Sequence, residues 1–104
     1  MELTFATPDL EATANSSPKL DRQFGADAPV VRQRLFELAA AENLAVLAQI
    51  PTLRFASESR GEFSIGAGNS RHIKFIPAAD APRGSTRRSL ELHSVTAIRI
   101  LAIG

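Results

Sequence analysis

The fold is decided by residues 63–75, which read FSIGAGNSRHIKF. Apolar side chains recur at every second position on both sides of residues 66–69: Phe63, Ile65, Ile73 and Phe75. A period of two is typical of strands that bury one face, and the tetrapeptide Gly-Ala-Gly-Asn favours a tight turn. The stretch therefore predicts a β-hairpin with its apolar side chains in the core.

Other alternating segments flank this hairpin and predict further strands. Before it, residues 52–56 alternate, with the apolar ones expected to face inward. Residues 95–103 form a last strand, and residues 2–6 a short first one. Residues 78–89 contain a glycine and three arginines and predict a long loop. The second half of the chain is thus predicted to be a β-meander.

Helical signals fill the first half of the chain. Thr7-Pro8 and Ser17-Pro18 each place a capping residue before a proline, which favours a helix start, and Gly25 is a typical stop. The strongest helix follows, with one apolar stripe at i, i+4 and i+7: Val31, Leu35 and Leu38. Asn43 ends this helix or caps a short turn, and Pro51 closes the helical half.

A helical half followed by a meander predicts an α+β fold. We expect the N-terminal strand and the helices to pack on one face of a mostly antiparallel four- to five-stranded sheet. The chain has 104 residues, of which 44% are apolar and 22% charged. These values fit a single globular domain, residues 1–104.

Composition excludes several classes of function. No apolar run approaches the roughly 18 residues that span a bilayer, and no N-terminal leader pattern is present, so we expect a cytoplasmic protein without a membrane partner. The chain has no cysteine and only two histidines, His72 and His93. These leave little with which to build a metal site. We expect neither a metal nor a cofactor.

The net charge of +1 hides an asymmetry along the chain. Residues 1–51 carry four cations against seven anions, whereas residues 52–104 carry eight cations against four anions. Ten of the cations are arginine, which suits bidentate pairing with phosphate. The basic second half favours a partner that contains phosphate.

The period of two places the charged residues of the predicted strands on one face of the sheet. If the apolar positions face the helices, the open face of the sheet carries Arg54, Arg60, His72, Lys74 and Arg99. Such a face favours the phosphates of a nucleic-acid backbone. The alternative is a ladder of surface ion pairs, because Glu62 faces the same way. Arg87 and Arg88 are weaker candidates for RNA binding, since flexible arginines bind phosphate without positioning it.

Stacking of bases on aromatic side chains is not expected. The chain has no tyrosine or tryptophan. All six phenylalanines are predicted to lie in the core: Phe5, Phe24, Phe36, Phe55, Phe63 and Phe75. A nucleic acid would therefore be held by charge and hydrogen bonds.

His72 is the candidate for proton transfer. An imidazole exchanges protons near neutral pH, and cationic neighbours favour its neutral form, which a general base requires. The alternative is an exposed strand histidine without a chemical role. His93 precedes the last strand and is interpreted as a structural or surface residue.

Four segments carry a family resemblance: LTFATPDLEATANSSPKLDRQFGADAPVVRQRLFELAAAENLAVLAQIP (residues 3–51), SRGEFSI (59–65), RHIKFIPAAD (71–80) and VTAIRIL (95–101). In this order they resemble the RelE/ParE toxin superfamily, in its HigB-like killer-protein branch. The resemblance covers nearly the whole chain. It implies a compact α+β toxin encoded beside an antitoxin.

For the active branch, the resemblance implies a metal-independent endoribonuclease that cleaves mRNA in the ribosome. In that chemistry the ribose 2′-OH attacks the adjacent phosphate, so the site needs a base, an acid and cations around the developing charge. The catalytic residues expected here are His72, Arg60 and Arg71. The expected partners are the cognate antitoxin, the ribosome and mRNA.

Three departures from the family pattern affect cleavage. The segment Ala56-Ser57-Glu58 lacks the usual lysine. The family's strand arginine falls at His72, with Arg71 on the other face. The Asp-Tyr-His-like tail of the branch would follow Gly104, where this sequence stops, so we expect weak or absent cleavage in this form and higher activity with such a tail. The alternative function is a non-enzymatic interaction protein, either a ParE-like topoisomerase inhibitor or a degenerate toxin that binds only its antitoxin.

Overall fold

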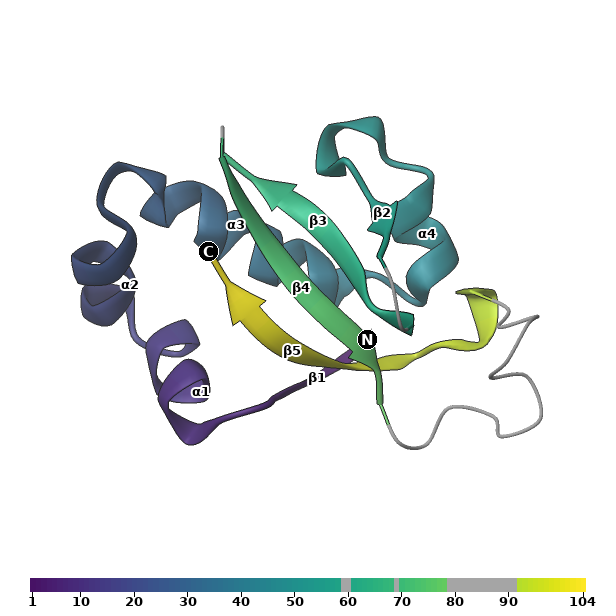
Figure 1. Cartoon of the computed structure of the whole chain (residues 1–104), viewed down its shortest axis with the longest axis horizontal. Helices are drawn as coiled ribbons and strands as arrows, with labels where there is room; N and C mark the ends of the chain where they lie inside the picture. The colour runs from purple at the N-terminus through teal and green to yellow at the C-terminus, as the bar shows by residue number, and fades with distance from the viewer. Residues whose placement is uncertain (59–60, 69, 79–91) are drawn as a thin grey trace.

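A five-stranded mixed sheet is the centre of the structure (Figure 1). The computed structural model describes residues 1–58, 61–68, 70–78 and 92–104. The strands are β1 Glu2–Phe5, β2 Ala56–Ser57, β3 Phe63–Ala67, β4 Arg71–Pro77 and β5 Ala97–Ile103. They lie in the order β1-β5-β4-β3-β2, with β1 parallel to β5 and the other neighbours antiparallel. The predicted α+β class is confirmed.

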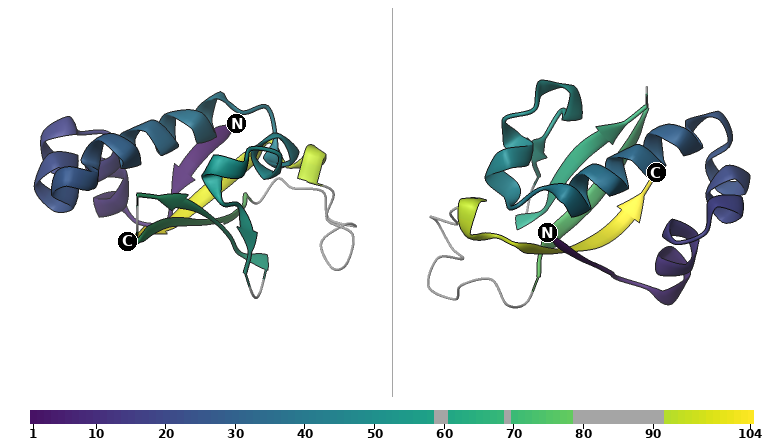
Figure 2. Two further views of the ribbon diagram at one scale, coloured as in Figure 1. Left: turned by 90° about the horizontal axis from the view of Figure 1, so that it is seen from above. Right: turned by 180° about the vertical axis from the view of Figure 1, so that it is seen from behind.

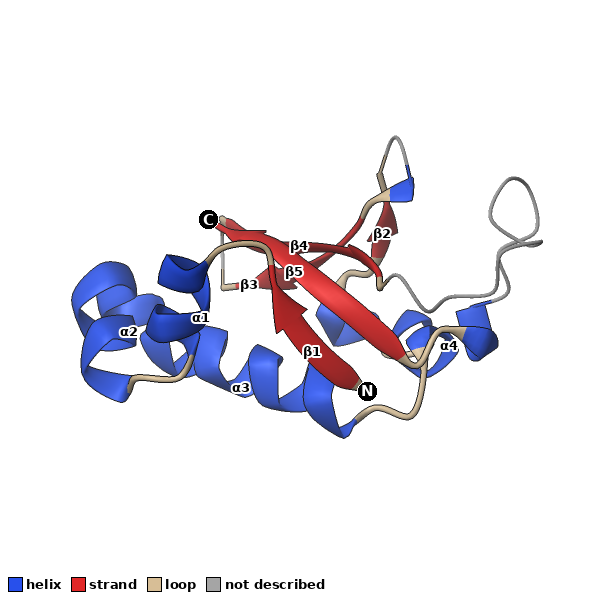
Figure 3. Ribbon diagram, turned by 90° about the horizontal axis from the view of Figure 1, so that it is seen from below, coloured by secondary structure: helices blue, strands red, loops and turns tan. Residues whose placement is uncertain are grey.

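The helices gather on one side of this sheet (Figures 2 and 3). Their bounds are α1 Pro8–Ala14, α2 Ser17–Phe24, α3 Ala28–Ala40 and α4 Leu44–Ala48. Helix α3 crosses one face of the sheet, with α1 and α2 beyond one of its ends and α4 near the other. The opposite face, turned toward the viewer in Figure 1, carries none of the described helices and is called the helix-free face below.

Side-chain caps fix the helix starts. The Thr7 hydroxyl accepts a hydrogen bond from the Leu10 amide, and Asn43 Oδ1 accepts one from Val46. Asn43 therefore caps α4 in addition to following α3. The cap of α2 is Ser16 and not the predicted Ser17, which is already helical. Each cap satisfies an amide that has no partner within its helix.

The core forms between α3 and the sheet. The stripe Val31, Leu35 and Leu38 is buried, as predicted. It joins a continuous cluster with the inward residues of the central strands: Ile65, Ile73, Phe75, Ile98 and Ile100. Burial of this apolar surface is the main driving force for the fold.

The strand predicted for residues 52–56 is wrong. Pro51–Leu53 forms a 3₁₀ turn, in which the Leu53 amide bonds to the Ile50 carbonyl and the Arg54 amide to the Pro51 carbonyl. Arg54 has a left-handed backbone with φ 53°, and only Ala56–Ser57 pair as a strand. Pro51 favours the turn because its ring fixes φ and removes an amide that a strand ladder needs.

The prediction that all phenylalanines are buried is also wrong. The side chain of Phe36 on α3 is 68% exposed. Phe36 follows Leu35 directly, so it is rotated by about 100° around the helix from the buried stripe. The position of Phe36 on the helix therefore exposes its ring, although the ring is apolar. None of the described helices is long and apolar enough to cross a membrane.

Phe75 and Phe36 provide a matched test of this core. We expect Phe75→Ala to lower the free energy of unfolding by about 3–5 kcal/mol, because it leaves a cavity beside α3. Phe36→Ala should change it by less than about 0.5 kcal/mol, since the ring is in water. Urea unfolding followed by circular dichroism measures both values. Equal losses in the two variants would contradict the assignment of the core.

Candidate nucleic-acid interface

Strand β4 places two of the predicted residues on the helix-free face. His72 and Lys74 are exposed, and they alternate with the buried Ile73 and Phe75. Side chains two residues apart on a strand point the same way and lie about 7 Å apart. The assignment of His72 and Lys74 to one open face is therefore confirmed.

Arg99 on β5 joins this face because of a bulge. The partners of β4 jump from Ala102, opposite Lys74, to Ile100, opposite Phe75, so Leu101 is the extra residue. Opposed residues in an antiparallel pair face the same side, and a regular ladder through this point would have turned Arg99 toward the core. The bulge reverses the alternation and places the exposed Arg99 opposite Ile76, diagonal to Lys74.

The guanidinium of Arg54 reaches the same face over Gly66. A Cβ atom on Gly66 would overlap three Arg54 atoms, Nη2, Nε and Cζ. Gly66 is paired with His72 on the neighbouring strand. A side chain at residue 66 would therefore point to the same face as that of His72. The guanidinium occupies the space that a side chain opposite His72 would fill.

The pairing brings Arg54 and His72 close together. The amide and carbonyl of His72 both bond to Gly104 on the other side of β4. Gly66 and His72 therefore form a non-hydrogen-bonded pair, in which the two Cα atoms are about 4.5 Å apart and the side chains are closest. Arg54 thus lies beside His72 although it is not on a strand.

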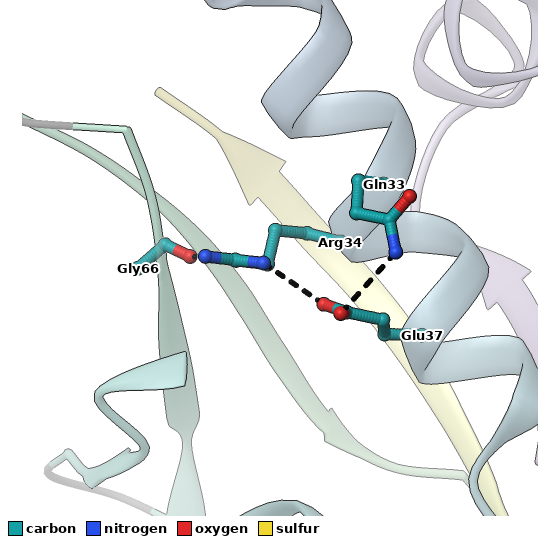
Figure 4. A network of polar contacts seen from close by, with 4 residues as sticks. All are labelled: Gln33, Arg34, Glu37 and Gly66. Carbon is teal, nitrogen blue, oxygen red and sulfur yellow. Dashed lines mark hydrogen bonds and ion pairs between the residues drawn. The ribbon is translucent and has the colours of Figure 1, made fainter. Parts of the chain in front are cut away.

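Two arginines hold the exposed edge of β3 at this point. Arg54 Nη2 donates to the Gly68 carbonyl at 2.5 Å, and Arg34 Nε donates to the Gly66 carbonyl at 3.0 Å. Arg34 extends from α3 and also pairs with Glu37 at 3.0 Å, while Gln33 bonds to the same carboxylate (Figure 4). These bonds satisfy edge carbonyls that β2 is too short to cover.

Arg71 lies on the opposite side of the sheet from His72. Its Nε donates to Asp27 Oδ2 at 2.8 Å, and its guanidinium carbon lies 5.0 Å from the centre of the Phe24 ring. Both partners belong to the helical layer. The structure therefore does not bring Arg71 together with His72, and its contacts fit a structural role.

The alternative interpretation, a ladder of ion pairs, is not seen among the described residues of the helix-free face. Within the described residues, the ion pairs are Arg32–Asp21, Arg34–Glu37 and Arg71–Asp27. None includes Arg54, Lys74, Arg99 or the alternative partner Glu62. Ser64, which lies opposite Lys74, is only 1% exposed and donates a hydrogen bond to Glu58 at 2.8 Å.

Three of the predicted site residues, Arg60, Arg87 and Arg88, lie outside the described residues, as does most of the predicted loop at 78–89. The side chain of His93, interpreted above as a structural or surface residue, is not described either. The site that the structure supports is therefore made of Arg54, His72, Lys74 and Arg99. In the described part of the chain, no three histidine or acidic side chains come together in a way that could hold a metal ion.

Sequence reasoning missed the contribution of Gly66. It assigned this residue to the turn, whereas Gly66 is a strand residue of β3 in contact with Arg54. A glycine at an outward position of a strand often marks a close approach by another group. That signal was present, but it does not identify which group approaches.

No protein-family model matches the chain, and neither a curated protein nor a solved structure matches it. The resemblance to the RelE/ParE superfamily thus stays a prediction. The fold and the charges of the helix-free face are the observations available for assigning a function.

Arg71 gives a test that separates structure from binding. We expect Arg71→Ala to lower the free energy of unfolding by about 1–2 kcal/mol, because it removes a charged hydrogen bond and a cation–π contact. RNA affinity should not change. Arg32→Ala, which removes a more exposed ion pair, should cost less than about 0.5 kcal/mol. A loss of RNA binding without a loss of stability in Arg71→Ala would contradict this role.

Proposed function

We propose that the chain is a toxin of a type II toxin–antitoxin system, of the RelE/ParE superfamily and its HigB-like branch. It binds RNA on the helix-free face, and its metal-independent cleavage of RNA is weak or absent in this form. The observation that carries this proposal is the presence of Arg54, His72, Lys74 and Arg99 on one face of the sheet, with Arg54 beside His72. No described carboxylate pairs with these cations.

The geometry supports a division of roles among these residues. Cations on a shallow sheet face attract the phosphates of RNA, and counterion release provides much of the affinity. His72 is the histidine among the described residues of this face, and an imidazole is the side chain that most often serves as a general base. In cleavage His72 takes the proton of the ribose 2′-OH as that oxygen attacks the adjacent phosphorus. The bond from phosphorus to the 5′-oxygen then breaks, which leaves a 2′,3′-cyclic phosphate, and the leaving 5′-oxygen takes a proton from the imidazolium or from water. The guanidinium of Arg54 stabilises the charge that develops on the phosphorane oxygens.

The proposed partners follow from the same class of protein. They are mRNA on the ribosome as substrate, in the cytoplasm, and a cognate antitoxin protein that blocks the toxin. The basic face complements the negative charge of ribosomal RNA, and this complementarity favours fast association.

A second candidate function is binding without cleavage, as in a topoisomerase inhibitor or a degenerate toxin. The exposed ring of Phe36 favours it, because this ring lies in a hollow with Pro29, Arg32 and Gln33 on the helical side. An exposed aromatic beside an arginine is typical of protein-binding surfaces. This function uses the helical layer and needs no proton transfer.

Inducing the gene in bacteria separates the two candidates. The toxin proposal expects growth arrest with cleavage of mRNA. Arrest with altered plasmid supercoiling and intact mRNA would favour the topoisomerase inhibitor, and normal growth would favour the degenerate toxin.

The basic face is tested by charge reversal. We expect the double variant Lys74→Glu/Arg99→Glu to weaken binding to single-stranded RNA. It should also reduce the slope of log K against log salt by about 1.4, since each lost phosphate contact removes about 0.7. Fluorescence anisotropy at several salt concentrations measures both effects.

Lys19→Glu/Arg22→Glu on α2 is the matched control for this pair. It exchanges one lysine and one arginine, both exposed and both on a helix of the helical layer. The control should bind RNA nearly as the wild type does. Equal salt slopes for the two double variants would show that RNA binding depends on overall charge and not on this face.

His72 is tested by removal of the imidazole. Losing general acid–base assistance typically costs about 10²–10⁴ in rate, so His72→Ala should lose detectable cleavage of ribosome-bound mRNA in single-turnover experiments. Affinity for RNA should fall far less than the cleavage rate, because Arg54, Lys74 and Arg99 are intact. Cleavage at the wild-type rate in His72→Ala would exclude the proposed base.

A further inference from the structure

We propose that Arg54 and His72 together form a two-point site for one phosphate group, and that this site exists because residue 66 is glycine. The inference rests on the proposed function for its natural ligand, a phosphodiester of the RNA backbone. It deepens that function by replacing a diffuse basic face with one defined position for the reacting phosphate.

The first argument is steric. The Arg54 guanidinium lies against the backbone of Gly66, in the space that any side chain there would occupy. Gly66 does not have a positive φ, so this position does not need glycine for backbone reasons. What requires glycine is the close approach of Arg54. Glycine is a weak strand former, but its lack of a side chain leaves space for the Arg54 guanidinium opposite His72.

The second argument concerns hydrogen bonds. A guanidinium has five N–H donors, and among the described residues Arg54 uses one nitrogen, on the Gly68 carbonyl. That bond fixes the plane of the group while the other donors stay available. The His72 side chain has no hydrogen-bond partner among the described residues. Two neighbouring groups with free donors are suited to the oxygens of one phosphate.

The third argument concerns rigidity. Arg54 follows the 3₁₀ turn and has a left-handed backbone, and Arg34 holds the Gly66 carbonyl from the helical side. His72 is fixed through its backbone, which bonds to Gly104. The Arg54 guanidinium and the backbone of His72 are therefore positioned before a ligand arrives. Such preorganisation favours stabilisation of charge over loose attraction.

Gly66→Ala tests the site without changing the charge of the protein. The added methyl must displace the guanidinium, which can move because it is the end of a flexible side chain. Gly104→Ala is the matched control, because Gly104 is also paired with His72 but a Cβ there meets no atom within 4 Å. Arg54→Lys is a second variant that keeps the charge and loses the fork of donors.

The measurement follows the imidazole signals by NMR during titration with inorganic phosphate. His72→Gln identifies the signal of His72, since the chain has only two histidines. We expect a saturable shift in the wild type and in Gly104→Ala. In Gly66→Ala and in Arg54→Lys the affinity should fall by about tenfold or more, because a hydrogen-bonded charged contact is lost. Unfolding midpoints near that of the wild type show that both variants fold.

The possible results separate this site from the proposed function. Equal phosphate affinity in Gly66→Ala and Gly104→Ala would overturn the site, and so would wild-type affinity in Arg54→Lys. A short single-stranded RNA that competes with phosphate in the wild type supports the backbone as natural ligand. Phosphate binding that depends on Gly66 while RNA neither competes nor is cleaved supports the site and contradicts the proposed function alone.

Discussion

The strict alternation of β4 is the constraint on which the rest of the structure depends. This strand lies in the middle of the sheet, between β5 and β3. Ile73 and Phe75 are fully buried beneath the helices, while His72 and Lys74 face the other way. A shift of one residue in register would exchange the two sets. Burial of Ile73 and Phe75 thus determines that His72 and Lys74 lie on the helix-free face.

Two of the cations of the site, Arg54 and Arg99, reach the helix-free face because the backbone near them is irregular. The bulge at Leu101 brings Arg99 to the helix-free face, and the left-handed turn at Arg54 brings a guanidinium over Gly66. Both features have a conformational cost, which the surrounding core must offset. Irregularities of this kind are common beside functional sites, and here each one adds a cation to the same face.

Regular elements could be predicted from the sequence, whereas these irregular ones could not. The hairpin and the buried stripe of α3 follow from local periods, and the cap of α1 follows from Thr7-Pro8. The path of residues 51–55 depends on the competition between Pro51 and strand pairing. The contact of Arg54 with Gly66 joins positions far apart in the chain. Alternation predicted that Arg54 faces outward on a strand, but its actual place beside His72 depends on tertiary structure.

The distribution of ion pairs explains why a chain of net charge +1 can present a basic surface. In the helical layer, acidic residues from the first half of the chain pair with arginines: Arg32, Arg34 and Arg71. The cations of the helix-free face form no such ion pairs among the described residues. Gly66 contacts one arginine of each kind. Its carbonyl accepts a hydrogen bond from Arg34, which is in an ion pair, and its α-carbon packs against Arg54, which is not. The local field at this residue therefore depends on Arg54 and its neighbours more than on the total charge, and a phosphate at the helix-free face would meet exposed cations whose direction is set by the sheet.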